Sequence, residues 1–183
     1  MRPPGVLDRA PGIIAGYLPI VLLMVALLGA GLYMIRSRSV PRSEAVRTTA
    51  LDLGLGLWLA LTLMLTIVPV GQARPPQPIA LIPFLDAIQR VTDGLSSVPD
   101  AASDIILNVI AFLPFGFLAA LRWGRRWQTL AIVVAAALST GIELAQAIEA
   151  VGRFSSATDV VTNTAGAALG FVLGLRIGDR RET

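Results

Sequence analysis

The chain of 183 residues contains neither cysteine nor histidine. Without cysteine it has no disulfide, thiol nucleophile or thiolate metal site, and without histidine it has no imidazole base or ligand. These absences exclude intramembrane enzymes that use a serine–histidine pair, a histidine nucleophile or a histidine-bound metal. We predict no catalytic residues, no cofactor and no bound metal. A hard cation held by carboxylates is the one metal chemistry that the absences leave open.

Lysine is also absent, so all 15 basic residues are arginine, and only 15% of the residues are charged. Hydrophobic residues make up 55% of the chain and the mean hydropathy is +0.72, well above the values of a soluble domain. The arginines are scattered over the loops between apolar runs, where they indicate topology, so we expect no nucleic-acid partner. Arginine in place of lysine is typical of a GC-rich bacterial genome. We therefore expect a multi-pass protein in the lipid bilayer of a bacterial inner membrane.

Five apolar stretches are long enough to cross a hydrocarbon core about 30 Å thick, which takes about 20 residues. They cover approximately residues 13–35, 50–70, 102–121, 129–148 and 158–177. The first exceeds the apolar run of a signal peptide and ends in Arg36 and Arg38, so we expect it to be retained. The sequence predicts an all-α polytopic membrane bundle with five transmembrane helices.

The arginines predict the orientation of this bundle. Ten of the 15 lie at the end of or after the first, third and fifth stretches, and a positive excess marks the cytoplasmic side. The N-terminus is then outside and the C-terminus cytoplasmic. We divide the chain into an N-terminal two-helix segment (1–70), a proline-rich outer loop (71–101), a three-helix core (102–177) and a cytoplasmic tail (178–183).

The outer loop contains an amphipathic pattern. Its apolar residues recur at helical spacing, and polar residues take the other side; the apolar set is Leu81, Phe84, Leu85, Ile88 and Val91. An interfacial helix on the outer surface and a loop packed over the mouth of the bundle both agree with this pattern. Either arrangement places the segment near the outer ends of the core helices.

Two further features of the core concern helix packing. Gly166, Gly170 and Gly174 recur every four residues, which predicts the close approach of a neighbouring helix. Pro114 lies inside the third apolar stretch and predicts a kink near residues 110–114, because proline lacks a backbone donor.

The polar residues set into these apolar runs are the candidate functional residues. A charge at the bilayer centre costs roughly 2.5 to 3.5 kcal/mol even on lenient scales, so such groups require partners, water or a ligand. The set is Asp104, Asn108, Glu143, Gln146, Arg153, Asp159 and Asn163. The fourth stretch runs opposite to the third and fifth, so all seven residues come to the same outer level. They predict a polar pocket that faces outward.

Packing roles compete with this interpretation. Asp104 and Asp159 each begin a stretch, where aspartate is an ordinary helix cap, and Asn108 and Asn163 are able to join helices by hydrogen bonds. Glu143 is the hardest to explain by packing alone, because a carboxylate more than one turn inside a span is costly. We expect it to be an ion-pair centre, a proton-binding group or a ligand contact.

The order of several motifs resembles the VanZ-like family. The motifs are Leu81-Ile82-Pro83-Phe84, Asn108 followed by Pro114 and Gly116, Glu143-x-x-Gln146, and Gly152-Arg153 leading to Asp159-x-x-x-Asn163-x-x-Gly166. The resemblance covers about residues 79–175. It implies membership of a family named for an accessory protein of glycopeptide resistance, associated with teicoplanin, whose molecular activity is poorly defined.

Three functional hypotheses follow. The first is a binding protein of the cell envelope, whose outer pocket contacts a lipid head group or a lipid-linked or sugar-phosphate precursor, with an antibiotic-resistance role as one form of it. The second is an accessory or assembly subunit of a larger membrane complex. The third is an enzyme acting on a lipid through Asp104, Glu143 and Asp159, and it ranks last because no nucleophile arrangement accompanies these carboxylates.

Overall fold

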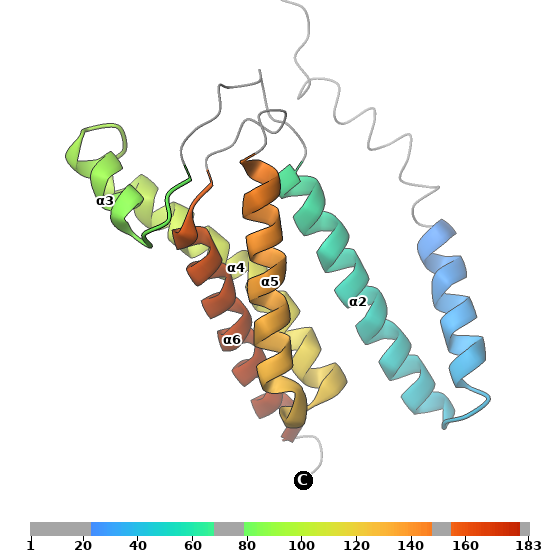
Figure 1. Cartoon of the computed structure of the whole chain (residues 1–183). Helices are drawn as coiled ribbons and strands as arrows, with labels where there is room; N and C mark the ends of the chain where they lie inside the picture. The colour runs from blue at the N-terminus through green and yellow to red at the C-terminus, as the bar shows by residue number, and fades with distance from the viewer. Residues whose placement is uncertain (1–22, 68–78, 148–154, 180–183) are drawn as a thin grey trace, which may run out of the picture. The chain divides into compact units, whose positions relative to one another are not determined.

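The computed structural model describes residues 23–67, 79–147 and 155–179, and this part of the chain is helical without a β-strand. The helices in chain order are Leu23–Arg36, α2 (Arg42–Ile67), α3 (Leu85–Thr92), α4 (Val98–Trp123), a short 3-10 helix η1 (Arg125–Trp127), α5 (Gln128–Gln146) and α6 (Ala157–Asp179) (Figure 1). The all-α prediction is confirmed.

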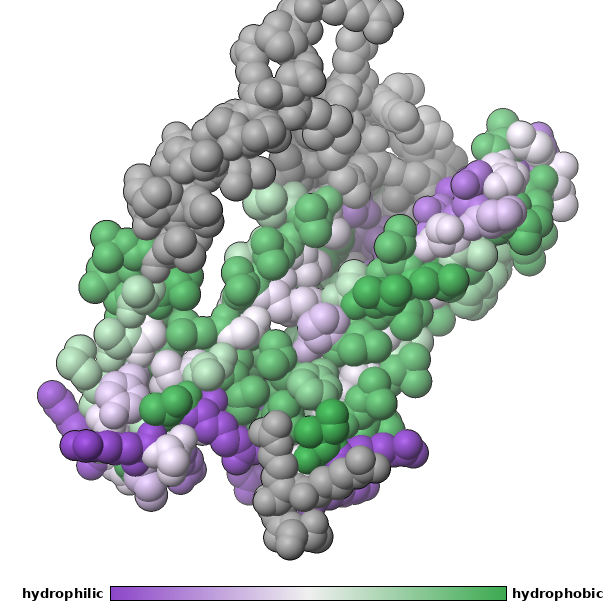
Figure 2. Space-filling model, turned by 180° about the vertical axis from the view of Figure 1, so that it is seen from behind, coloured by the Kyte–Doolittle hydropathy of each residue, from purple (hydrophilic) through white to green (hydrophobic). Residues whose placement is uncertain are grey.

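Four of the predicted spans correspond to helices that are long and apolar enough to cross a membrane. They are α2, α4, α5 together with η1, and α6. The predicted first span is described only as the apolar helix Leu23–Arg36, and its residues 13–22 lie outside the described residues. On the face seen in Figure 2 the surface of the helices is largely apolar, and hydrophilic residues gather near helix ends, as lipid-facing helices require.

The chain divides into two compact units, residues 1–53 and 54–183, and the boundary falls inside α2. In the first unit, Arg36 forms an ion pair with Asp52, and its Nη1 donates to Thr49 Oγ1 at 3.3 Å. Asp52 lies three turns into α2, so it pairs with an arginine and does not cap the helix. The second unit contains the candidate functional residues.

Close contact between α4 and α6 organises the second unit. A Cβ atom added at Gly166, Gly170 or Gly174 would lie 2.2, 2.0 or 2.6 Å from the carbonyl oxygen of Val109, Leu113 or Phe117, respectively. Only glycine permits this approach, which confirms the packing predicted from the glycine spacing. Each glycine faces the residue 57 positions earlier, so α4 and α6 run parallel and begin at the same end of the unit.

An aromatic group joins α2 to this pair. The Trp58 ring packs 5.2 Å from the Phe112 ring and 4.9 Å from the Phe115 ring, measured between centroids. Trp58 Nε1 donates to the Ala111 carbonyl oxygen at 2.7 Å, in the turn before Pro114, a residue that has no amide hydrogen to donate within the helix. α4 continues through Pro114, and the kink expected there stays a prediction.

The start of α4 excludes one of the two roles that the sequence leaves open for Asp104. Ser97 caps the helix: its Oγ accepts from Asp100 N, and the Asp100 carboxylate accepts from Ser97 N, in a reciprocal capping box. α4 therefore begins at Val98, four residues before the predicted boundary. Asp104 lies in the second turn and is not a helix cap.

The contact at the α6 glycines predicts that alanine substitution destabilises the protein at these glycines but not at a glycine outside the contact. Gly170→Ala forces a Cβ against backbone atoms of α4, and we expect the free energy of unfolding in detergent to fall by about 1 to 3 kcal/mol, as for an overpacked core. Gly141→Ala in α5 is the matched control, because a Cβ there meets no atom within 4 Å and alanine favours helix. Equal unfolding midpoints for the two variants would contradict the close contact.

Candidate functional site

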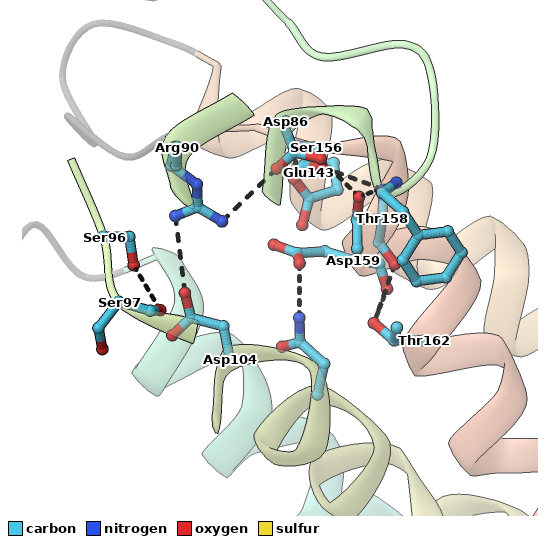
Figure 3. Close-up of polar contacts among 12 residues, drawn as sticks. Asp86, Arg90, Ser96, Ser97, Asp104, Glu143, Ser156, Thr158, Asp159 and Thr162 are labelled. Carbon is cyan, nitrogen blue, oxygen red and sulfur yellow. Dashed lines mark hydrogen bonds and ion pairs between the residues drawn. The ribbon is translucent and has the colours of Figure 1, made fainter. Parts of the chain in front are cut away.

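Polar residues from four helices meet where α4 and α6 begin and α5 ends, beneath α3 (Figure 3). We call this group the polar cluster. Its members are Asp86 and Arg90 of α3, Asp104 and Asn108 of α4, Ser139 and Glu143 of α5, Ser156 before α6, and Thr158, Asp159 and Asn163 of α6. α4 and α6 are parallel, and α5 lies between them in the sequence and runs in the opposite direction. The starts of α4 and α6 and the end of α5 therefore lie at the same end of the unit.

A hydrogen bond between Asn108 and Asp159 joins α4 to α6. Asn108 Nδ2 donates to Asp159 Oδ1 at 2.6 Å, and both side chains are half-buried. Asp159 lies in the first turn of α6, where a carboxylate is favoured by the helix dipole. Its side chain reaches across to α4, so it does not serve as the cap of its own helix.

Glu143 joins the last turn of α5 to the start of α6. Its Oε2 accepts from the backbone N–H of Ser156 at 2.8 Å, and the residue is only 5% exposed. The Ser156 hydroxyl accepts from Thr158 N at 3.0 Å, which satisfies an amide of the first turn. The Glu143 carboxylate is therefore buried against the positively polarised end of α6.

Thr158 attaches α3 to this end of the bundle. Its Oγ1 donates to Asp86 Oδ1 at 2.6 Å and accepts from Phe84 N at 2.7 Å. Phe84 has φ +65°, a left-handed conformation that is rare for a bulky residue. The threonine hydroxyl thus helps to hold a strained residue at the start of α3, and Asp86 becomes buried as a result.

Arg90 lies between two carboxylates at the rim of the cluster. Its guanidinium nitrogens are 3.6 Å from Asp86 Oδ2 and 3.6 Å from Asp104 Oδ2. The side chain of Asp104 is 55% exposed, whereas that of Asp86 is 5% exposed, so the pair with Asp104 faces outward. Arg90 therefore connects the buried part of the cluster to its exposed edge.

The extended segment before α3 pairs with the residues before α6. Ala80 N donates to the Ser155 carbonyl at 3.1 Å, and Ala157 N donates to the Ala80 carbonyl at 2.8 Å. This parallel bridge between Ala80 and Ser156 and the contacts of Thr158 hold the segment at both of its ends. The residues around 80–86 are thereby fixed over the start of α6.

α3 covers the mouth of the bundle and also has the exposed apolar side of an interfacial helix, so it combines the two arrangements expected for the amphipathic segment. Its polar side faces the cluster, with Asp86 buried, so the helix covers the end of the bundle. Apolar residues of the segment are exposed, namely Leu81 and Ile82 before α3 at 78% and 62%, and Ile88 on the helix at 58%. Such a surface is suited to contact with lipid at the membrane interface.

The remaining predicted residues lie deeper in the bundle than Asp159 and Glu143, outside the polar cluster or outside the described residues. Asn163 Nδ2 donates to Ser139 Oγ at 2.9 Å, one turn below Asp159 and Glu143, and its buried Oδ1 has no hydrogen-bond partner within the described ranges. Gln146 points to α2, where Nε2 donates to the Thr66 carbonyl at 3.1 Å. Arg153 lies outside the described residues.

The structure thus places five of the predicted residues in the cluster, namely Asp104, Asn108, Glu143, Asp159 and Asn163. In the sequence, Asp86 and Arg90 belong only to the polar side of an amphipathic helix, and no pattern there singles out Thr158. The signal that was available is the spacing of four residues between the acid and the arginine, which favours an ion pair on one helix face.

The cluster carries more negative than positive charge. Its acidic members are Asp86, Asp104, Glu143 and Asp159, whereas Arg90 is its basic member among the described residues. In the ranges that the structure covers, no three acidic side chains are placed to hold a metal ion together. Hydrogen-bond donors on a ligand are the groups that this excess of acceptors best accommodates.

The family model described as VanZ/LLP1 matches residues 53–177, which is more than half of the chain. The chain belongs to the VanZ/LLP1 family. The match extends from the middle of α2 to the last turn of α6 and includes the whole polar cluster. No curated protein and no solved structure matches the chain. With the four apolar helices, family membership makes this a multi-pass membrane protein.

The attachment of α3 is testable through Thr158. Thr158→Val keeps the shape of the side chain but leaves Asp86 and Phe84 N without their partner, at a cost of about 1 to 3 kcal/mol for each buried group. We expect backbone amides of residues 84–92 to exchange hydrogen faster, with α4 and α6 unchanged. Thr140→Val is the control, because that exposed hydroxyl bonds only within α5. Unchanged exchange in α3 would show that Thr158 does not hold it.

Proposed function

We propose that the protein binds the polar head of an envelope lipid or lipid-linked precursor at the polar cluster, in the inner membrane of a bacterium. The observation that supports this proposal is the burial of Glu143 beside Asp86 and Asp159, each carried by a different helix. Its bond to Ser156 N–H needs only an acceptor, which a neutral glutamine also supplies. An ionisable carboxyl group retained in place of an amide at so buried a position is better explained by a ligand.

The surroundings of the cluster suit an amphiphile. Arg90 and Asp104 stand at its exposed rim, where a guanidinium is able to bind a phosphate and the carboxylates accept from hydroxyl or amine groups. The same two helices also present exposed apolar side chains, with Leu107 of α4 62% and Ile88 of α3 58% exposed. A lipid with a polar head and apolar tails would contact both surfaces together.

The proposal is tested by Glu143→Gln. The variant removes the charge and keeps an acceptor for Ser156, so we expect normal abundance in the membrane. The lipid retained through mild purification, measured by mass spectrometry against wild type, should fall roughly tenfold to a hundredfold, as for the loss of a charged hydrogen bond.

The matched control is Gln146→Ala, on the same helix but facing α2. It should keep the lipid. If Glu143→Gln retains the same lipid at the wild-type level, the carboxylate does not bind a ligand. If the variant disappears from the membrane while Gln146→Ala remains, the role of Glu143 is structural and the proposal fails.

The exposed apolar side of α3 favours one second candidate, an accessory subunit that docks a partner helix there. Purification of the full chain in mild detergent separates the two functions, because an accessory subunit leaves the membrane with unrelated polypeptides in fixed proportion. A role in glycopeptide tolerance is the envelope phenotype suggested by the family. It predicts that deletion changes growth in teicoplanin and that Glu143→Gln fails to restore it.

A further inference from the structure

A second surface lies at the other end of α4, away from the polar cluster. A hollow of about 280 Å³ is lined by Trp123, Trp127, Leu130 and Val134. Trp123 is the last residue of α4, Trp127 ends η1, and the other two lie on the first two turns of α5. The volume approaches the roughly 300 Å³ at which small-molecule pockets begin.

The turn between α4 and α5 produces this hollow. Gly124 adopts φ +74° after the last residue of α4, a conformation that favours glycine, and η1 then leads into α5. Trp127, Leu130 and Val134 are three and four residues apart, so they share one helix face. The two tryptophans therefore border an apolar floor that is open to the surroundings.

Positive charge borders the same hollow. The guanidinium carbon of Arg126 lies 5.8 Å from the centre of the Trp127 ring, and both residues are exposed. Arg122 and Arg125 belong to the same turn, and Arg125 is 3.5 Å from Asp179 at the end of α6. Tryptophan rings prefer the level of the lipid head groups, which places the arginines beside lipid phosphates.

We propose that this hollow binds one anionic phospholipid, with an acyl chain between the two tryptophans and the phosphate against Arg126. The apolar lining suits a chain, and the arginines complement a negative head group. The hollow shares no residue with the polar cluster, so this lipid site is independent of the function proposed for that cluster.

The tryptophans report directly on the occupant. The chain has three tryptophans, and the third, Trp58, is only 8% exposed within the packed helices. In nanodiscs of the full-length protein, phosphatidylglycerol with brominated acyl chains should quench the fluorescence of Trp123 and Trp127 more strongly than brominated phosphatidylcholine at the same mole fraction. High salt should reduce the difference, because it screens the arginines.

Arg126→Gln should weaken the preference for phosphatidylglycerol by about fivefold, the effect of one arginine at an anionic surface. Arg38→Gln, at another exposed loop arginine, is the control and should leave the preference unchanged. Val134→Phe should reduce quenching by both lipids, because it fills the hollow.

Three results would overturn the proposal. Equal quenching by the two lipids would show that the site does not select an anionic head group. An unchanged preference in Arg126→Gln would remove the phosphate contact. Absence of quenching by either lipid would show that a protein segment, and not a lipid, covers the tryptophans.

Discussion

Backbone contact between α4 and α6 is the constraint on which the candidate site depends. Lipid tails are as apolar as leucine, so helices in a bilayer are held together by close packing and hydrogen bonds rather than by hydrophobic burial. Gly166 and Gly170 allow α6 to touch the carbonyls of Val109 and Leu113 directly. This contact determines which turns of the two helices face each other, and it brings Asp159 within 2.6 Å of Asn108.

Once the register of α4 and α6 is determined, the free amides at the start of α6 explain many of the hydrogen bonds in the polar cluster. The first amides of a helix lack intrahelical acceptors and carry partial positive charge. Glu143 accepts from the amide of Ser156, and Ser156 accepts from that of Thr158. These bonds explain how carboxylates are tolerated at the start of α6. One acceptor for each free amide would satisfy the helix, and the cluster contains more acidic residues than these amides require.

Local patterns in the sequence predicted the helices, the glycine contact and the gathering of polar residues, because each depends on spacing along one helix. The hydrogen-bond partner of each polar residue depends on where α2 and α3 pack. The spacing of residues along one helix does not determine that packing. Gln146 therefore meets Thr66 and not the cluster. The sequence left open whether Asp104 is a helix cap, and the structure excludes that role because Ser97 and Asp100 form a capping box that begins α4 earlier.

The two ends of α4 present opposite chemistry, and helix dipoles give one physical reason. Asp100 and Asp159 lie in the first turns of α4 and α6, and Arg122 and Arg176 lie in their last turns. Because the two helices are parallel, their dipoles add, and each end favours the charge found there. The arginines that predict the orientation of the chain also supply the cations beside the tryptophan hollow. The same arginines therefore support both the predicted orientation and the proposed lipid site.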